Sequence, residues 1–362
     1  MKVVSIYLGR KGGGALYSYE MTKALSNKAE VLYIVSKQAE NIGEIRAISK
    51  GNFELYEMDT YMDIKSLIVS TLKVGKFLKM RRRVREFNPT IIYHPMSHTW
   101  TFIINYFLKK YKKVLTIHDP VSHLGEKNII MSFTHKIEIK QCDRFVILSK
   151  IFIEELIRQG INHQMITVIP HGIFDNYKRT KFEEKTYQMR LLFFGRISEY
   201  KGVGVLLEAF KIIKREVVEA SLLVVGSGDM SKYDKLVKET DGIEVVNQWI
   251  TDEEVEKYFN KTDILVVPYI DASQSGVILT AYGFNMPVIA TKIGGLPEQV
   301  VNKETGILVE PNNVEDLANA CISLLNQPEM VKSMGKNAYD FANEKYNWNV
   351  LSDSLMKSFM RL

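Results

Sequence analysis

The sequence contains little cysteine and no long apolar run. Two of its 362 residues are cysteine, Cys142 and Cys321, which is too few for a disulfide framework or a cysteine-rich metal site. No apolar run reaches the roughly 18–20 residues that a membrane-spanning helix needs. The apolar segment between Lys2 and Gly9 is too short for the core of a signal peptide and predicts a β-strand instead. These absences predict a cytoplasmic protein without zinc and without an exported segment.

Two common catalytic motifs are absent as well. The sequence has neither a G-x-S-x-G nucleophile elbow nor an H-E-x-x-H zinc motif, which argues against hydrolysis by either chemistry. The composition, 46% apolar and 25% charged, is that of an ordinary globular protein. A chain of this length is too long to fold around a single hydrophobic core, so we expect two domains.

Charge is distributed unevenly along the chain. Up to Pro170 there are 26 Lys and Arg against 15 Asp and Glu, a net charge of +11, whereas the remainder carries −5. The excess lies in two clusters: Lys73, Lys76, Lys79, Arg81, Arg82, Arg83 and Arg85, and then Lys109, Lys110, Lys112 and Lys113. The first cluster is interleaved with Leu72, Phe77, Leu78 and Val84 at helical spacing. It predicts either a solvated helix or one that lies with its apolar side on an anionic membrane. Nucleic acid is not expected, because the nearby aromatic residues form no base-stacking pattern.

Short apolar runs alternate with longer amphipathic stretches, which is typical of parallel sheets covered by helices. In the first half strands are expected at 3–8, 30–35, 90–94, 113–117, 144–148 and 166–169. In the second half they are expected at 189–194, 221–225, 243–246, 264–268, 288–291 and 306–309. Helices are expected at 16–25, 203–216, 231–239, 251–260, 277–285, 296–301, 314–325 and 348–362. We therefore predict two Rossmann-like α/β domains, 1–172 and 189–345, joined by a linker at 173–188.

Two turns after strands have the composition of phosphate sites. Gly12, Gly13 and Gly14 follow the first strand and open a helix, so the backbone there can approach an anion closely. Arg196 and Lys201 follow the first strand of the second half, with Lys201 at the start of a helix. Two cations at a helix N-terminus suit a departing diphosphate.

The second half resembles the retaining GT-B glycosyltransferases of family four. The segments that carry the resemblance are FGRISEYKGVGVLLEAF, LLVVGSGD, VPYIDASQSGVILTAYGFNMPVIAT, KIGGLPEQV and TGILVEPNN. The first half adds the KGGGA turn, the segments 116–120 and 143–149, and VIPHG. The resemblance implies a GT-B fold, with two domains facing each other across a cleft. It also implies that the last segment, 346–362, packs back on the first domain.

The resemblance assigns roles to individual residues. Arg196 and Lys201 match the pair that holds the donor phosphates, and Gly13 and Gly14 match the turn that faces them from the other domain. His118 matches the histidine near the reacting sugar. In the family, a loop and the start of a helix face the sugar and the phosphate. The corresponding residues here are Ser275, Gly276, Val277 and Ile278. The nucleotide is expected near Gly226, Trp249 and Ile250. A D-x-D pair, which carries a metal-bound diphosphate in the other large glycosyltransferase fold, is absent, so no metal and no other cofactor is expected.

One departure from the family concerns its two glutamates, which lie eight positions apart. Those positions are Ala272 and Thr280 here, and Ser273–Val277 reads S-Q-S-G-V, similar to a T-Q-S-G-V variant. The contacts to the ribose and to the donor sugar are then expected from Gln274, Ser275 or Thr280. Two alternatives therefore stay open: an inactive nucleotide-binding or scaffold subunit, and a sugar-nucleotide epimerase.

The acceptor side is expected in the basic first half. His118 and Asp119 come at the carboxyl end of a strand, where polar residues tend to face a ligand, and His94 and His98 follow the preceding strand. The expected substrates are a nucleotide diphosphate sugar and a glycan or lipid-linked acceptor. The expected location is the cytoplasm, at the inner face of the membrane.

Overall fold

The computed structural model describes residues 1–118, 120, 129–173 and 186–362. They form two compact units. Unit 1 contains the described residues up to His171 together with Trp348–Leu362, and unit 2 contains the described residues of Gly172–Asn347. Most of the expected linker, together with Asp119, lies outside the described residues.

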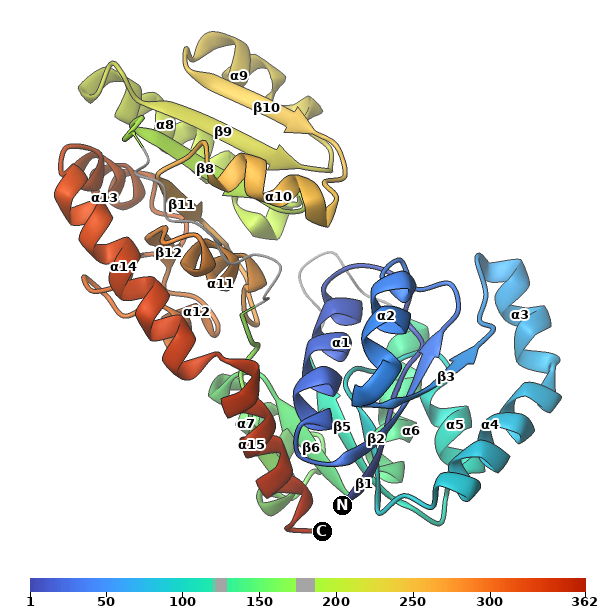
Figure 1. Cartoon of the computed structure of the whole chain (residues 1–362). Helices are drawn as coiled ribbons and strands as arrows, with labels where there is room; N and C mark the ends of the chain where they lie inside the picture. Colours follow the sequence, from blue (N-terminus) through green and yellow to red (C-terminus); the bar gives the residue numbers. More distant parts are fainter. Residues whose placement is uncertain (119, 121–128, 174–185) are drawn as a thin grey trace. The chain divides into compact units, whose positions relative to one another are not determined.

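Unit 1 is built on a seven-stranded parallel sheet with the order β3-β2-β1-β4-β5-β6-β7 (Figure 1). Its strands are β1 (Lys2–Tyr7), β2 (Glu30–Ser36), β3 (Glu54–Met58), β4 (Ile91–His94), β5 (Lys112–Ile117), β6 (Arg144–Ile147) and β7 (Ile166–Val168). The strand order reverses between β1 and β4. At such a switch point the loops after the two strands diverge and leave room for a ligand.

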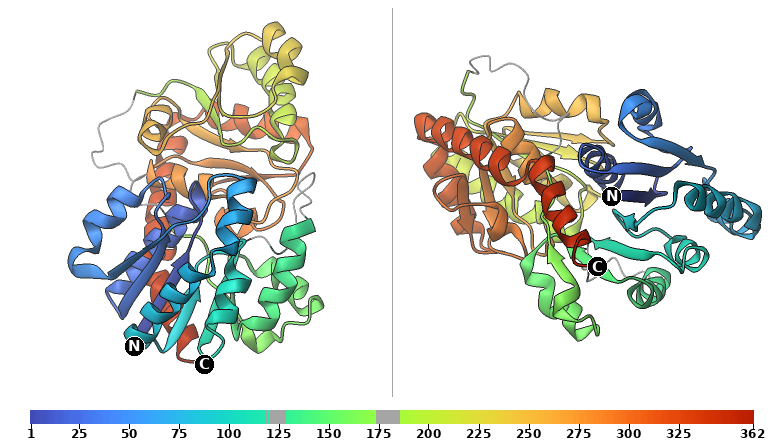
Figure 2. Two further views of the ribbon diagram at one scale, coloured as in Figure 1. Left: turned by 90° about the vertical axis from the view of Figure 1, so that its right-hand side faces the viewer. Right: turned by 60° about the horizontal axis from the view of Figure 1, so that its bottom comes forward.

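The helices of unit 1 cover both faces of this sheet, as the two views of Figure 2 show. They are α1 (Gly13–Ser26), α2 (Ile42–Asn52), α3 (Ile64–Leu72), α4 (Val74–Phe87), α5 (Thr101–Phe107), α6 (Ile129–Gln141), α7 (Ile153–Arg158) and α15 (Trp348–Phe359), with 3₁₀ turns η1 (Lys150–Phe152) and η2 (His163–Met165). The terminal helix α15 packs against α1, and Lys28 of unit 1 pairs with Asp353. The chain end is thus part of unit 1.

Unit 2 has a six-stranded parallel sheet with the order β10-β9-β8-β11-β12-β13. The strands are β8 (Arg190–Phe194), β9 (Ser221–Gly226), β10 (Ile243–Asn247), β11 (Ile264–Val267), β12 (Val288–Thr291) and β13 (Gly306–Val309). The helices are η4 (Glu199–Lys201), α8 (Val203–Glu216), η5 (Ser231–Tyr233), α9 (Asp234–Glu239), α10 (Asp252–Phe259), α11 (Gly276–Gly283), α12 (Leu296–Gln299), α13 (Val314–Leu325) and α14 (Pro328–Lys345). Here the strand order reverses between β8 and β11. The two sheets confirm the predicted pair of Rossmann-like α/β domains.

The central strands form because their residues are apolar on both faces. All residues of β4, β6, β11 and β12 are buried. Strands covered by helices on both sides read as continuous apolar runs, which is why the sequence predicts them well. Strand β3 was not expected: it lies at the edge of its sheet, contains Glu54 and Glu57, and only Met58 is buried.

The sequence-based expectation for the first basic cluster needs a correction. Phe77 and Val84 of α4 do not face outward; they are 1% and 0% exposed and belong to the core of unit 1. Leu72 and Leu78, in contrast, are 75% and 50% exposed. The apolar side of α4 is therefore used for folding. Within the part of the chain that the structure describes, no helix is long and apolar enough to cross a membrane.

Candidate active site

The loop after β8 carries Arg196 and Lys201, at the switch point of the unit 2 sheet. Gly195 follows β8 with φ +125°, a value that residues with a side chain rarely adopt. Arg196 is exposed, and Lys201 ends the short helix η4. Gly202 then opens α8, and a Cβ atom there would lie 1.9 Å from the Pro268 carbonyl oxygen. The loops after β8 and β11 are thus in direct backbone contact.

Lys201 is positioned by an aromatic ring from the neighbouring loop. Its Nζ lies 3.7 Å from the centre of the Tyr269 ring and 5.2 Å from that of Tyr200. The Tyr200 carbonyl oxygen accepts a hydrogen bond from the Ile270 N–H at 2.7 Å. A cation over a ring face is attracted by about 0.5–2 kcal/mol. The ammonium group is thereby held at the carboxyl edge of the sheet.

Helix α11 begins beside the same loop. The Val277 side chain lies 3.9 Å from where a Cβ on Gly195 would stand. Ser275 is the N-cap of α11 and makes no capping hydrogen bond with its side chain. The first N–H groups of a helix have no partner within the helix and carry partial positive charge. The first N–H groups of α11, from Gly276 to Ile278, therefore lie beside the loop that carries Arg196.

The start of α11 is fixed by Gln299, which the sequence analysis did not single out. The fully buried Gln299 side chain accepts from the Ser275 N–H at 2.8 Å and donates to the Ser275 carbonyl oxygen at 3.0 Å. The Tyr269 hydroxyl lies 3.3 Å from Ser275 Oγ. Because Gln299 is 24 positions from Ser275, no local spacing indicates this contact.

Gly226 closes the next loop of unit 2. It has φ +146°, and a Cβ there would lie 1.8 Å from the Gly195 carbonyl oxygen. Gly228 is similarly packed against Ile197 and exchanges two hydrogen bonds with Asn247 at the end of β10. Beyond β10, Trp249 is 63% exposed and Ile250 is partly exposed. The residues that are expected near the nucleotide thus lie on successive loops at one edge of the sheet.

The positions of the missing glutamates are filled differently. Ala272 is 5% exposed. A Cβ on Gly294 would lie 1.6 Å from the carbonyl oxygen of Ala272, so the two backbones are in close contact. Thr280 is 6% exposed and its hydroxyl donates to the Gly276 carbonyl oxygen at 3.1 Å, within α11. Gln274 is partly exposed. Of the three substitutes proposed from the sequence, Gln274 is the one whose side chain reaches the surface.

In unit 1 the glycine turn lies at the switch point between β1 and β4. Gly12 is the N-cap of α1 with φ +75°, and its N–H donates to Glu40 Oε1 at 2.8 Å. Gly13 has open space where a side chain would stand. A Cβ on Gly14 would lie 2.4 Å from Met96 Sδ and 2.7 Å from the Tyr7 hydroxyl oxygen. A side chain at position 14 would therefore have to displace the Met96 and Tyr7 side chains.

His118 lies at the end of β5 beside aromatic rings. Its Nε2 is 3.0 Å from the Pro95 carbonyl oxygen, and its ring meets the Tyr17 ring edge-on at 4.6 Å. Tyr17 also contacts His171 and Trp348, at 5.4 Å and 5.3 Å between ring centres. His118 is partly exposed, so its ring is oriented by the fold and still reaches the surface of unit 1.

The other two histidines of the acceptor side lie deeper. His94 is 1% exposed, its Nε2 is 2.9 Å from Asn105 Oδ1, and burial lowers its pKa to about 4. The Nδ1 of the partly exposed His98 accepts from the Trp100 N–H, and its Nε2 lies 3.2 Å from the Tyr61 hydroxyl. Burial, then Arg10 and Lys76, lower the pKa of His98 to about 3. Both rings are neutral near pH 7, and His94 has no access to an acceptor in this arrangement.

A buried carboxyl group beside the segment 95–98, which follows β4, was missed by the sequence analysis. Glu138 of α6 is 1% exposed and accepts a hydrogen bond from the Ser97 hydroxyl. Burial raises the pKa of Glu138 to about 7. The segment 95–98 thus contacts His118, Gly14 and Glu138 through three successive residues, Pro95, Met96 and Ser97.

The residues that the structure describes contain no group of three or more His, Cys, Asp and Glu that could hold a metal ion. Cys142 and Cys321 are both buried and free.

Both units match families of known proteins. The model described as "Glycosyltransferase Family 4" matches residues 11–176, and the model described as "Glycosyl transferases group 1" matches residues 188–327. An uncharacterized glycosyltransferase of Methanocaldococcus jannaschii is 28% identical over 65% of this chain and 64% of its own length. The capsular polysaccharide biosynthesis glycosyltransferase CapM of Staphylococcus aureus is 24% identical over 64% of this chain and 65% of its own length. The alignments thus span a little under two thirds of either relative.

The fold is shared over the whole chain with a solved structure. Anabaena Alr3699/HepE, in complex with UDP and glucose, matches with a TM-score of 0.75 and 16% identity, covering 100% of both chains. The two family models together span most of the chain, and this likeness shows the two-domain GT-B fold.

Proposed function

We propose that this protein is a retaining, metal-independent glycosyltransferase of family four, of an S-Q-S-G-V variant. It moves a hexosyl or related sugar from a nucleotide diphosphate sugar to a glycan or lipid-linked acceptor. The proposed setting is the synthesis of a cell-surface polysaccharide in the cytoplasm. The observation that carries the proposal is the grouping of Arg196, Lys201 and the start of α11 at the switch point of unit 2.

This grouping is suited to the leaving group of the reaction. When the bond between the sugar and the diphosphate breaks, negative charge develops on the departing oxygen. Fixed cations and helix N–H groups stabilise that charge without reorganising during the reaction, and one such donor is worth about 10²- to 10³-fold in rate. Arg196 and Lys201 supply the charge neutralisation that a divalent cation supplies in other transferases.

The retaining outcome is proposed from the family resemblance. In such a reaction the acceptor hydroxyl attacks the face of the sugar that the diphosphate leaves. In this chain Gln274 is the proposed side-chain contact to the sugar, because Ser275 is 2% exposed and the Thr280 hydroxyl is used within α11. In unit 1 we propose that Gly13 and Gly14 face the diphosphate and that His118 lies near the acceptor. The UDP and glucose bound in Alr3699/HepE, and the role of CapM in capsular polysaccharide biosynthesis, support a nucleotide-sugar donor and a polysaccharide product.

The first experiment is a thermal-shift screen against UDP, GDP, ADP, CMP and their sugar conjugates, in the presence of EDTA. A ligand that binds only the folded state raises stability by about 2.7 kcal/mol at a hundredfold excess over Kd. We expect one nucleotide family to raise Tm in the wild type and not in Arg196→Ala. With that donor, NMR of the product should give the same anomeric configuration as in the donor. An inverted product, or turnover that stops with EDTA, contradicts the proposal.

The substitution of both family glutamates favours one second candidate, an inactive nucleotide-sugar-binding subunit. It predicts the same nucleotide-dependent Tm shift but no consumption of the donor with any acceptor. Measuring free nucleotide release from the bound conjugate separates the two, because a transferase releases the nucleoside diphosphate in every cycle.

A further inference from the structure

Helix α3 of unit 1 has three apolar residues toward solvent, while polar residues and the half-buried Leu67 face the fold. Ile68, Val69 and Leu72 are 60%, 56% and 75% exposed. The polar side faces inward: the Ser70 hydroxyl donates to the Thr60 carbonyl oxygen at 2.9 Å, and Thr71 Oγ1 accepts from Trp100 Nε1 at 2.8 Å. A surface helix of a globular protein normally has the opposite arrangement.

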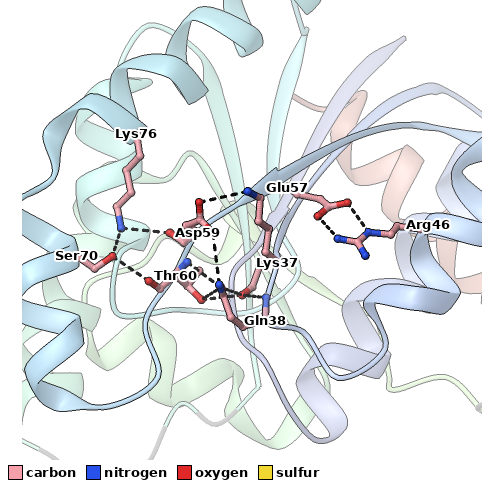
Figure 3. Close-up of polar contacts among 9 residues, drawn as sticks. Lys37, Gln38, Arg46, Glu57, Asp59, Thr60, Ser70 and Lys76 are labelled. Carbon is pink, nitrogen blue, oxygen red and sulfur yellow. Dashed lines mark hydrogen bonds and ion pairs between the residues drawn. The ribbon is translucent and has the colours of Figure 1, made fainter.

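This orientation of α3 is held by specific contacts. The Lys76 ammonium donates to Ser70 Oγ at 2.5 Å and to the Asp59 carbonyl oxygen at 3.3 Å (Figure 3). It also lies 3.5 Å from the centre of the Trp100 ring. Burial lowers the pKa of Lys76 to about 8. Turning the apolar residues inward would break these hydrogen bonds, so their exposure is a property of the fold.

The helix begins with an ordered cap as well. Asp63 accepts from the Ser66 N–H at 2.8 Å, and Ser66 Oγ accepts from the Asp63 N–H at 2.9 Å, which is a reciprocal capping box. Such a cap stabilises a helix start by about 1 kcal/mol. The exposed apolar residues are therefore presented on a defined helix.

Further exposed apolar residues lie on α4, which begins two residues after α3 ends. Val74 and Leu78, one turn apart on α4, are 49% and 50% exposed. We define the α3–α4 surface by its five exposed apolar residues: Ile68, Val69, Leu72, Val74 and Leu78. Exposed apolar residues gathered on adjoining elements mark an interaction site more often than isolated ones do.

Positively charged residues are interspersed with these apolar residues in the sequence. From Ile64 to Phe87 the sequence has eight Lys and Arg, and Glu86 is its one acidic residue. Lys73 stands between Leu72 and Val74, Lys65 precedes Ile68 by one turn, and Arg82 follows Leu78 by one turn. All three cations are exposed. An apolar face with cations at its border matches the boundary between the acyl chains and phosphates of an anionic bilayer.

We propose that the α3–α4 surface binds the face of a membrane that contains anionic lipids. The five apolar side chains enter the boundary below the headgroups, and the flanking Lys and Arg meet lipid phosphates. A second copy of the chain fits less well, because it would bring two surfaces of the same charge together. Single-stranded nucleic acid fits less well because Phe77 and Trp100, the aromatic residues nearest the cations, are 1% exposed.

The test is a flotation assay with vesicles of phosphatidylcholine alone or with added phosphatidylglycerol. It uses the full chain without donor or acceptor, so its outcome is independent of the proposed glycosyl transfer. We expect the wild type to float only with the anionic vesicles and to be released by salt, since screening weakens the ionic part. The double variant Ile68→Ser/Leu72→Ser should bind at least about tenfold more weakly, because burial of one such side chain is worth that factor or more.

Matched controls change exposed residues elsewhere. Val218, 66% exposed in unit 2, is replaced by Ser as the apolar control, and Lys235 and Lys238 of α9 by Glu as the charge control. The corresponding charge variant of the surface is Lys73→Glu/Lys79→Glu. All variants should keep the wild-type Tm because the changed side chains are exposed. The proposal is overturned if the wild type stays unbound on anionic vesicles, or if both surface variants float as it does. A wild-type dimer in sedimentation that Ile68→Ser/Leu72→Ser dissociates, without vesicle binding, would assign the surface to a second copy instead.

Discussion

The Lys201 ammonium lies 3.7 Å from the centre of the Tyr269 ring, whose hydroxyl lies 3.3 Å from Ser275 Oγ. One buried ring therefore contacts both the cation and the cap of the helix that we propose to hold the donor diphosphate. Tyr269 follows β11 and Lys201 follows β8, so the contact bridges the switch point of the sheet. Both groups are positioned by the same side chain.

Two replacements of Tyr269 separate these contacts. Tyr269→Phe keeps the ring under Lys201 and loses the contact with Ser275, so nucleotide affinity should change by less than about twofold. Tyr269→Leu loses the ring and should weaken nucleotide binding about fivefold, the equivalent of about 1 kcal/mol of cation–π attraction. Isothermal titration calorimetry with the nucleotide found in the screen measures both. Equal affinity of Tyr269→Leu and the wild type would show that the ring does not position Lys201.

Arg196 and Lys201 are the two cations that we propose to bind the donor phosphates. Replacing either of them should lower the rate of turnover. We expect Arg196→Ala and Lys201→Ala each to lower kcat about 10²- to 10³-fold, the range for loss of one charge-stabilising donor. Arg196→Lys should restore only part of the rate, because an ammonium group cannot bind a phosphate in the bidentate way. Steady-state kinetics gives the values, with Lys235→Ala as a control on an exposed lysine of α9. If both alanine variants keep the wild-type rate, the inactive-subunit alternative is favoured.

Gln299 should be important for both folding and donor binding. Gln299→Leu leaves the Ser275 N–H and carbonyl groups buried without their side-chain partner. Each such group costs about 1–3 kcal/mol, so the free energy of unfolding should fall by about 2–4 kcal/mol. Urea unfolding measures the loss, and nucleotide titration of the folded variant measures the effect on α11. Gln327→Leu is the control: its side chain is exposed, and a change within about 0.5 kcal/mol is expected there. A similarly small change in Gln299→Leu would show that Ser275 is held without this side chain.

The elements that the sequence predicts well are those whose pattern is local. The central strands appear as continuous apolar runs, and α8 and α13 were expected with the bounds that they have. Helix α14, 18 residues long, was not expected although it is the longest helix among the described residues. Its buried face includes Gly335, Ala338 and Ala342, and a Cβ on Gly335 would lie 2.0 Å from the Asn285 carbonyl oxygen. Small residues that pack backbone against backbone give only a weak hydrophobic pattern.

The candidate site was predictable in part for the same reason. Arg196, Lys201 and the start of α11 lie in local motifs at strand ends. Gln299 and Glu138 do not, because their partners are 24 and 41 positions away. The apolar residues interleaved with the cations of α4, such as Phe77 and Leu78, indicate an amphipathic helix, but they do not tell which of them faces the core. That depends on α5 and Trp100, which pack against α4 from later in the chain.

Glu138 should make stability depend on pH near neutrality. Its pKa is raised from 4.5 to about 7 by burial, so the folded protein keeps the proton up to about pH 7 while the unfolded chain releases it near 4.5. The unfolded state binds fewer protons in this window, and the free energy of unfolding therefore falls as the pH rises from about 4.5 to 7. A shift of this size corresponds to about 3 kcal/mol. The neighbouring Cys142 has its pKa raised to about 12, mainly by burial, and keeps its proton throughout.

The variant Glu138→Gln isolates this contribution. Its amide oxygen can still accept from the Ser97 hydroxyl, but it has no proton to release, so its stability should fall less than that of the wild type between pH 5 and pH 8. Urea unfolding at both pH values measures the difference between the two proteins, which we expect to reach about 2–3 kcal/mol in favour of the variant at pH 8. Glu208→Gln, which changes an exposed carboxylate on α8, should follow the wild-type profile. If Glu138→Gln also runs parallel to the wild type, Glu138 releases its proton at the same pH in the folded and unfolded chain, and its burial does not control ionisation.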